Sequence, residues 1–239
     1  MSWQFFSAQS LGAQREQQDC LGAWPSEDGS TVLVVMADGA GGHHGGQQAA
    51  HAAAQMAQSL WQRERPSMRE ARDFLEMTSR AAHGAISAMP QSPRTTWLAL
   101  MASDTQASWV HSGDSRLYQY TMGRLTQRTH DHSLIQILYE KGQVVEKETR
   151  SHPVRSVLLQ CLGGPEYLPV SHGSSTVGLE DVFILCTDGV WSALSEAYLL
   201  NLARCSAQNR QRAAEEVIVR AVKSGGPVAD NASLWIVGR

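Results

Sequence analysis

Two apolar segments of this chain each end on an Asp-Gly pair, and each time the residues that follow favour a helix. The segments are residues 31–39 (TVLVVMADG) and residues 183–189 (FILCTDG). Continuous runs of β-branched and other apolar residues are typical of strands buried on both faces. We therefore expect Asp38 and Asp188 at the ends of buried strands, which limits both the fold and the chemistry at that end.

The first Asp-Gly pair could belong to a tight turn, to a loop that binds phosphate or a dinucleotide, or to a metal site. A hairpin turn is the common one, but glycines and an alanine-rich segment follow the pair, so no second strand is available. A phosphate-binding loop needs a lysine after its last glycine, and residues 1–140 contain no lysine. A dinucleotide-binding loop needs glycine where His44 stands. The other interpretation is one corner of a metal site.

Two further aspartates stand beside other predicted strands. Asp114 lies between two of them, and Asp230 comes just before the last one. Carboxylates at the ends of adjacent buried strands lie on one rim, where like charges are costly unless cations pair with them. Hard oxygen ligands favour Mg²⁺ or Mn²⁺ over zinc. These residues alone leave a metal site and a structural turn both open.

The order of the predicted elements favours an α+β fold over a doubly wound parallel sheet, because strands and helices do not alternate regularly. Strands are predicted at 31–37, 97–102, 107–111, 117–120, 181–187 and 232–237. Helices are predicted at 50–61, 68–88, 133–141 and 214–221. Residues 124–167 are the least regular and are interpreted as an insert over the core. No linker or repeat divides the chain, so residues 1–239 are expected to form one domain.

The charge and cysteine content narrow the class of protein further. The net charge of −3 arises from 20 basic and 23 acidic residues spread along the chain, which argues against a nucleic-acid surface or a polybasic membrane anchor. Four cysteines show no CxxC spacing, and residues 1–4 do not resemble a signal peptide. No apolar run approaches the roughly 20 residues of a membrane span. We expect a cytoplasmic monomer whose thiols are reduced and mostly buried.

A series of short motifs covers almost the whole chain. In order they are 12–19 (GAQREQQD), 37–43 (ADGAGGH), 113–116 (GDSR), 125–126 (LT), 131–133 (DHS), 152–153 (HP), 162–163 (LG), 186–189 (CTDG) and 230–231 (DN). Each motif is weak alone, but their common order is specific. The chain resembles the metal-dependent protein phosphatases (PPM, the type 2C serine/threonine phosphatases) in their short bacterial form.

The resemblance implies a fold and a metal site. The fold is a central antiparallel β-sandwich flanked by helices on both faces, with two Mn²⁺ or Mg²⁺ ions at one end. Asp38 would bridge both ions, the backbone carbonyl of Gly39 would bind one of them, and Asp188 with Asp230 would bind the other. Asp19 would act through a water ligand. A third, weaker ion would use Asp114 and Asp188.

The resemblance also implies an activity, which is hydrolysis of phosphoserine or phosphothreonine in proteins by a metal-activated water. Cys186 is then a packed strand residue rather than a nucleophile. Arg15 would bind the phosphate, although it precedes Asp19 by four positions where the family usually has five. Ala40 cannot donate a proton to the leaving group, so water, His43 or His44 would have to do so.

Several alternatives and partners accompany this interpretation. Two rival functions stay open. One is an inactive scaffold or binding module, and the other is a phosphatase of small phosphoesters.

The family's Gly-Thr-Thr motif occurs here as 94–96 (RTT), which we interpret as structural, like His132 and His152 in the insert. The expected partner is a bacterial Ser/Thr kinase or its FHA-type target. Short relatives of this kind often accompany such proteins in type VI secretion clusters.

Overall fold

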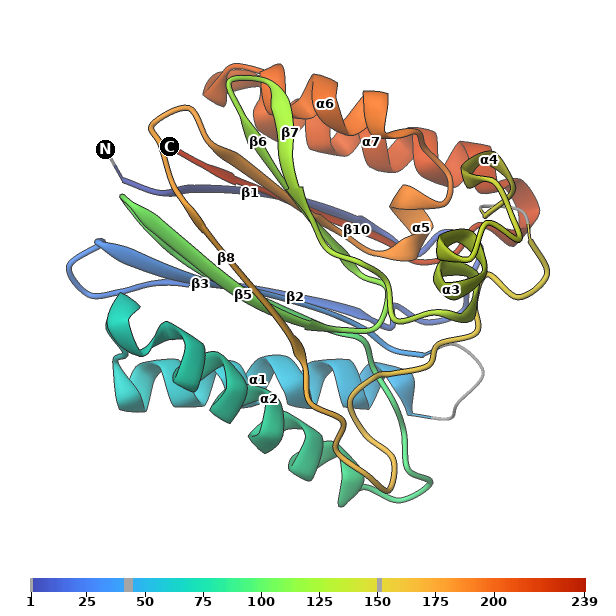
Figure 1. Ribbon diagram of the computed structural model, residues 1–239, viewed down its shortest axis with the longest axis horizontal. Helices are drawn as coiled ribbons and strands as arrows, with labels where there is room; N and C mark the ends of the chain where they lie inside the picture. Colours follow the sequence, from blue (N-terminus) through green and yellow to red (C-terminus); the bar gives the residue numbers. More distant parts are fainter. Residues whose placement is uncertain (1, 41–44, 150–151) are drawn as a thin grey trace.

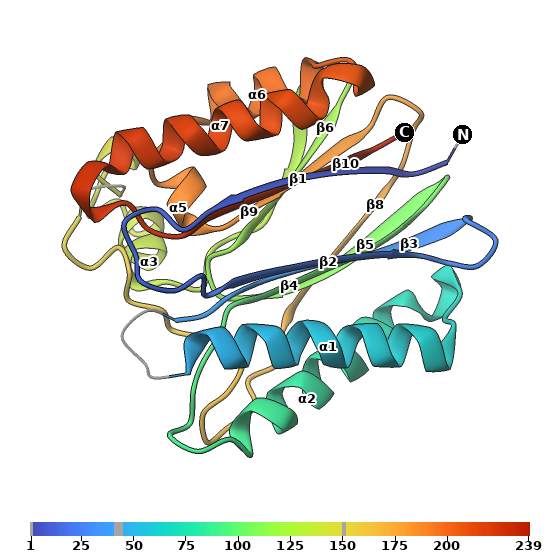
Figure 2. The same ribbon diagram turned by 180° about the vertical axis from the view of Figure 1, so that it is seen from behind.

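Two five-stranded antiparallel sheets form the centre of the computed structural model, which describes residues 2–40, 45–149 and 152–239. The strand order is β1-β10-β9-β6-β7 in the first sheet and β2-β3-β4-β5-β8 in the second. Helices α6 and α7 cover the outer face of the first sheet, and α1 and α2 cover that of the second (Figures 1 and 2). The expected β-sandwich with helices on both faces is confirmed.

The elements have the following bounds. The first sheet contains β1 (Gln4–Ser10), β6 (Arg116–Thr121), β7 (Arg124–Arg128), β9 (Val182–Cys186) and β10 (Ala232–Gly238). The second contains β2 (Asp19–Pro25), β3 (Thr31–Asp38), β4 (Trp97–Ser103), β5 (Gln106–Ser112) and β8 (Ser171–Thr176). The α-helices are α1 (Gly46–Glu64), α2 (Ala71–Ser87), α3 (Leu134–Glu140), α4 (Glu146–Thr149), α5 (Asp188–Trp191), α6 (Glu196–Arg204) and α7 (Arg210–Gly225).

The core consists of three apolar layers, one between the two sheets and one under each pair of helices. Helix α1 turns a stripe of buried alanines toward β2 and β3, because small residues at helical spacing let the helix approach the sheet closely. Helix α7 packs in the same way on β1 and β10. Between the sheets, the Trp235 indole N–H donates to the carbonyl of Val35 over 3.2 Å. Both predicted amphipathic helices therefore lie against a sheet.

Several elements differ from the sequence prediction. Strands β1, β2 and β8 were not predicted, because β1 and β8 are largely polar and β2 contains a glycine and a proline. Residues Arg124–Arg128, which we assigned to the insert, form the edge strand β7. The helix predicted at 68–88 is two elements, a short 3₁₀ turn, η1 (Met68–Glu70), and α2.

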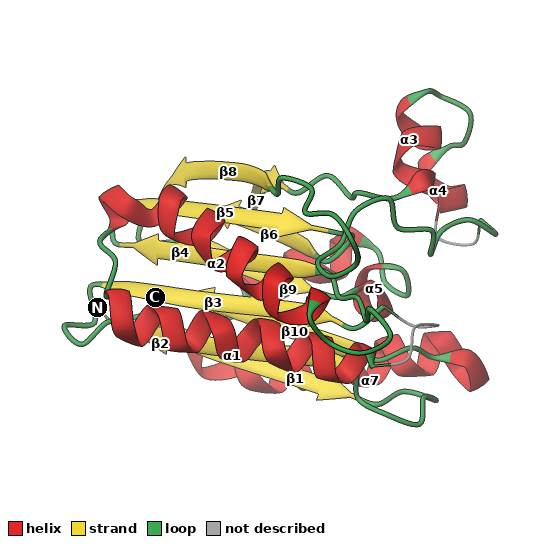
Figure 3. Ribbon diagram, turned by 90° about the horizontal axis from the view of Figure 1, so that it is seen from below, coloured by secondary structure: helices red, strands yellow, loops and turns green. Residues whose placement is uncertain are grey.

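The remainder of the insert lies at one end of the sandwich, where α3 and α4 project beyond the sheets (Figure 3). The chain termini lie at the opposite end (Figure 1). The four cysteines are free thiols, but only Cys186 is fully buried, so the expectation that most are buried was wrong. Within the described ranges, no helix combines the length and apolar character needed to cross a bilayer.

Candidate active site and metal centre

Five aspartates gather at the end of the sandwich that carries the insert. Asp38 ends β3 and stands directly opposite Asp19, the first residue of β2. Asp188 follows β9, Asp230 precedes β10, and Asp114 lies in the turn from β5 to β6. Antiparallel pairing explains this placement, because the end of one strand lies beside the start of its neighbour. We call these five residues the aspartate cluster.

The carboxylates of the aspartate cluster interact electrostatically. Burial is the largest cause that raises the pKa of Asp38 well above its usual value, followed by the charges of Asp19 and Asp188. Burial likewise raises the pKa of Asp188, followed by the charges of Asp114 and Asp230. Asp38 and Asp188 are nonetheless partly accessible to solvent. Concentrated negative charge of this kind favours binding of cations.

Asp19 carries an unused ligand atom. Its side chain is buried, with the residue 3% exposed, and burial raises its pKa to about 6. The Oδ2 atom accepts hydrogen bonds from the hydroxyls of Ser233 at 2.5 Å and Thr187 at 3.1 Å. The Oδ1 atom has no hydrogen-bond partner among the described residues. A buried acceptor without a partner is costly, and a cation or its water ligand would satisfy it.

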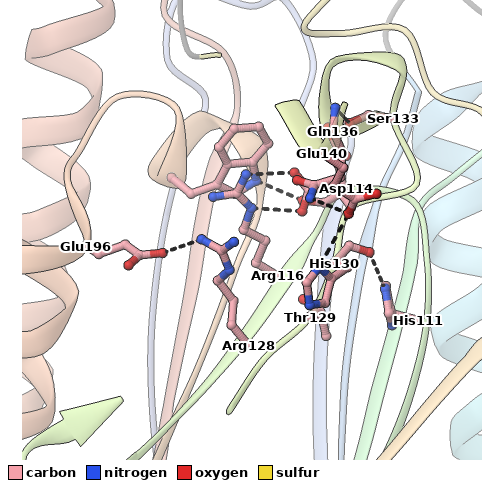
Figure 4. A network of polar contacts seen from close by, with 12 residues as sticks. His111, Asp114, Arg116, Arg128, Thr129, His130, Ser133, Gln136, Glu140 and Glu196 are labelled. Atoms are coloured by element: carbon pink, nitrogen blue, oxygen red, sulfur yellow. Dashed lines mark hydrogen bonds and ion pairs between the residues drawn. The ribbon is translucent and has the colours of Figure 1, made fainter. Parts of the chain in front are cut away.

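Asp114 is the link between the aspartate cluster and a second set of polar residues. Burial, and then the charge of Asp131, raises its pKa to about 7, while Arg116 opposes the rise. Its backbone carbonyl accepts a hydrogen bond from the indole N–H of Trp191 at 2.8 Å. Arg116 donates two hydrogen bonds to Asp131, at 2.9 and 2.7 Å, and its guanidinium lies 3.7 Å from the Trp191 ring centroid (Figure 4). We call Arg116, Asp131 and Trp191 the arginine network.

Backbone hydrogen bonds hold Asp38 in place. Its N–H donates to the hydroxyl of Thr96 at 3.0 Å, and its carbonyl accepts from the hydroxyl of Thr95 at 2.9 Å and the N–H of Thr96 at 2.8 Å. These threonines therefore have the structural role predicted for them. All three bonds use backbone atoms of Asp38, so none of them occupies its carboxylate.

Close packing explains why glycine follows both strand-end aspartates. A Cβ atom on Gly39 would lie 2.4 Å from the carbonyl carbon of Gly46, at the start of α1. A Cβ atom on Gly189 would lie 2.0 Å from the carbonyl oxygen of Asn231, beside the start of β10. Both contacts are far shorter than van der Waals distance. The repeated Asp-Gly pair thus marks close backbone approach at the site rather than a hairpin turn.

The donor set fits a hard divalent cation. The described residues bring carboxylates together, whereas Cys186 is buried in the core between the first sheet and its helices. No three His, Cys, Asp or Glu side chains in the described ranges converge closely enough to hold a single ion by themselves. An open arrangement of this kind suits Mg²⁺ and similar ions, which keep several water ligands and use one or two carboxylates each.

For the other residues predicted at the site, the described part of the chain gives no contact with the aspartate cluster. Arg15 is exposed in the loop between β1 and β2 and makes no ion pair or hydrogen bond with the described residues. His43 and His44 lie outside the described residues. Arg155, in the insert, was not predicted, yet its charge lowers the pKa of Asp188 against the larger effect of burial. No local pattern distinguishes Arg155 from other arginines, because its place depends on how the insert folds over the core.

The insert histidines have structural contacts. His132 accepts a hydrogen bond from the N–H of Gly113 at 3.2 Å, hydrogen-bonds Ser171 at 2.8 Å and stacks on His111 with 4.6 Å between ring centroids. Burial, and then the neighbouring His111, lowers the pKa of His132 to about 4, so the ring is neutral at physiological pH. His152 accepts a hydrogen bond from the N–H of Val154 at 3.3 Å. These contacts are typical of structural histidines rather than of metal ligands.

The sequence and fold match known proteins. A family model described as protein phosphatase 2C matches residues 9–222. The chain belongs to the protein phosphatase 2C family. The serine/threonine protein phosphatase PstP of Mycobacterium tuberculosis is 30% identical over 211 residues, which are 85% of this chain and 40% of PstP. The chain thus spans less than half of PstP, whereas the serine/threonine phosphatase stp of Listeria innocua is 26% identical over 95% of this chain and 91% of that protein.

Solved structures of the phosphatase 2C family share the sandwich. A crystal structure of PstP has a TM-score of 0.85 and 26% identity, covering 100% of this chain and 99% of that one. Another, of the catalytic domain of PstP in complex with two manganese ions, has a TM-score of 0.84 and 24% identity over 99% of this chain and 97% of that one. The two sheets with helices on both outer faces are therefore the fold that these solved phosphatase structures share.

Proposed function

We propose that this chain is a metal-dependent phosphatase that hydrolyses phosphoserine and phosphothreonine in proteins. The relatives named above are serine/threonine phosphatases, and one of their structures holds two manganese ions. The observation that carries the proposal is the aspartate cluster, in which buried acidic groups raise one another's pKa and Asp19 keeps an unpaired oxygen. Cations held by the aspartate cluster would suit a phosphate group, which is itself anionic.

The aspartate cluster supplies the ligands in this proposal. Asp38, Asp188 and Asp230 would hold two Mn²⁺ or Mg²⁺ ions together with the backbone carbonyl of Gly39, and Asp19 would bind through water. Asp114, with Asp188, would hold a third and weaker ion. When bound, the ions supply Lewis acidity that activates water for in-line attack on phosphorus and offsets the charge of the phosphoryl group.

Other residues of the chain orient the ligands and bind substrate. The hydroxyls of Ser233 and Thr187 fix one oxygen of Asp19, and its other oxygen has no hydrogen-bond partner among the described residues. Arg15 has no partner among the described residues and is available to bind phosphate through paired N–H donors. Arg155, in the insert, adds positive charge that acts on Asp188.

The proposal extends to organisation and partners. Residues 1–239 would form one catalytic domain, and the insert at 124–167, apart from β7, would shape substrate choice. The substrate would be a phosphorylated bacterial protein in the cytoplasm, either a Ser/Thr kinase or its FHA-type target, including those of type VI secretion. Co-purification of such a phosphoprotein with an inactive variant would test this part.

A metal titration with two substrates tests the central proposal. Calorimetry measures Mn²⁺ and Mg²⁺ binding, and phosphate release is followed from a phosphothreonine peptide and from an aryl phosphate at each metal concentration. We expect turnover of the peptide to rise with metal occupancy and to stop when a chelator is added. Turnover of the aryl phosphate alone would indicate a phosphatase of small phosphoesters. Metal binding without any turnover, or no binding at all, would indicate a scaffold.

A further inference from the structure

A groove of about 400 Å³ opens beside the aspartate cluster, between the segment that precedes β4 and the part of the insert that leads back to β8. Its lining includes Ala40, Arg94, Leu159, Glu166 and Leu168. Leu159 and Leu168 are 47% and 44% exposed, so the groove offers apolar surface to solvent. We call this the Arg94 groove.

The Arg94 groove adjoins the aspartate cluster directly. Ala40 follows Gly39 in the chain, and its N–H donates to the carbonyl of Arg94 over 3.0 Å. Cys161 also lines the groove. Burial is the largest cause that raises the pKa of its thiol, the charge of Arg94 and a hydrogen bond with the Arg94 side chain oppose the rise, and the charge of Asp114 adds to it. A peptide whose phosphorylated residue reaches Asp38 therefore has its neighbouring residues at the mouth of this groove.

Among the described residues that line the groove, Arg94 is the cation. It makes no ion pair with any described residue, although Glu166 lines the same groove. Its Nε atom is buried and has no hydrogen-bond partner in the described part of the chain. The residue as a whole is only partly buried and lines the groove, so its positive charge is accessible to an acidic group that enters there.

The backbone opposite Arg94 keeps the guanidinium in place. Gly163 and Gly164 both have positive φ angles, 89° and 86°, which favour glycine. A Cβ atom on Gly164 would lie 3.4 Å from Nε and 3.6 Å from Nη2 of Arg94. The two glycines therefore let the insert pass close over the side chain while leaving the groove open to one side.

We propose that the Arg94 groove receives the residues that flank the phosphorylated residue of the substrate, and that Arg94 selects a negatively charged group there. A carboxylate or a second phosphate would satisfy the guanidinium, because both offer paired acceptors that match its N–H donors. The exposed leucines would contact the apolar part of the same segment. This inference rests on the proposed phosphatase activity and adds a preference among its substrates.

Phosphothreonine peptides with matched sequences test the inference. One peptide has neutral neighbours, two carry glutamate before or after the phosphothreonine, and two carry a second phosphorylated residue at those places. Steady-state kcat and KM are measured for the wild type, Arg94→Gln, Arg94→Lys and the control Arg72→Gln. Arg72 is an exposed arginine in the first turn of α2 without an ion pair to any described residue, and it does not line the Arg94 groove.

We expect Arg94→Gln to raise KM about tenfold for at least one charged peptide and less than twofold for the neutral one. Arg94→Lys keeps the charge without the paired donors and should fall between the two. Whether glutamate or phosphate gives the larger effect identifies the source of the negative charge. Arg72→Gln should match the wild type with every peptide.

Other results would overturn the inference in recognisable ways. Equal turnover of all peptides by the wild type and Arg94→Gln would refute the charge preference while leaving the phosphatase activity established. An equal loss on every peptide and on an aryl phosphate, in both Arg94 variants, would show that the side chain only stabilises the site. Failure to hydrolyse any peptide in saturating Mn²⁺ would refute the proposed function itself.

Discussion

The aspartate cluster and the arginine network lie at the same end of the sandwich, yet their charges are balanced in opposite ways. In the arginine network, Arg116 and Asp131 neutralise each other and Trp191 covers the guanidinium. In the aspartate cluster, burial and repulsion raise the pKa of several carboxyl groups, and Asp19 retains an unpaired oxygen. The difference shows how a fold separates charges that stabilise it from charges that await a ligand.

Removing a carboxylate from the aspartate cluster should have the largest effect on activity. We expect Asp38→Asn to lower Mn²⁺-dependent hydrolysis of a phosphothreonine peptide by at least about 10³-fold, or about 4 kcal/mol in activation free energy. Without metal, the same variant should melt at the same or a higher temperature, because a repelling charge is gone. Calorimetry and phosphate release measure the two quantities. Wild-type turnover by Asp38→Asn would place the ion elsewhere.

Removing a charge from the arginine network should instead lower the stability of the fold. Asp131→Asn leaves Arg116 buried beside a neutral amide and should lower the free energy of unfolding by about 3 to 5 kcal/mol. Replacing Arg116 by Met and Asp131 by Leu together should cost less than the single change, since no unpaired charge remains. Chemical denaturation measures these differences. If Asp131→Asn unfolded with the same free energy as the wild type, the ion pair would not stabilise the fold and the contrast with the aspartate cluster would be wrong.

The pH dependence of stability tests how strongly the aspartate cluster disfavours negative charge when no metal is bound. The pKa of Asp19 is raised from 3.8 to about 6 in the folded chain, so folding favours its protonated form. Its destabilising effect is absent below about pH 4, grows between pH 4 and 6, and is complete above pH 6, where it reaches up to about 3 kcal/mol. In a chelator, the wild type should therefore lose stability relative to Asp19→Asn across that range. Parallel pH curves for the two proteins would contradict the shift.

The arginines near the site should give the smallest effect. We expect Arg15→Ala to raise KM about tenfold with little change in kcat, because it removes a phosphate contact rather than a metal ligand. Arg155→Ala is the matched variant, since Arg155 is the insert cation whose charge acts on Asp188. If only Arg155→Ala raises KM, the phosphate contact belongs to the insert and not to the loop before β2.

The strand-end aspartates show how far sequence alone could go. Asp38 and Asp188 follow unmistakable buried strands, so pattern and position sufficed to predict a shared rim. Asp19 came only from the family resemblance, because β2 (DCLGAWP) contains Gly22 and Pro25 and does not look like a strand. Its role as the neighbour of Asp38 depends on strand register, which local pattern does not specify here.

Two arginines near the site show what could not be predicted from the sequence. Neither Arg94 nor Arg155 lies in a periodic element, and each reaches the site because distant segments pack together. Arg94 was interpreted only as part of a structural RTT motif, and the threonines of that motif do hold Asp38. The guanidinium beside them was missed, because the groove that it faces is formed mainly by residues more than 60 positions later.

The pairing of β1 with β10 has a consequence for synthesis of the chain. Asp19 depends on Ser233 of the last strand for its shortest hydrogen bond, and Asp230 stands just before that strand. A nascent polypeptide that has not yet emerged from the ribosome as far as residue 238 therefore lacks part of the site. The aspartate cluster can thus assemble only after β10 has been synthesised and has paired with β1.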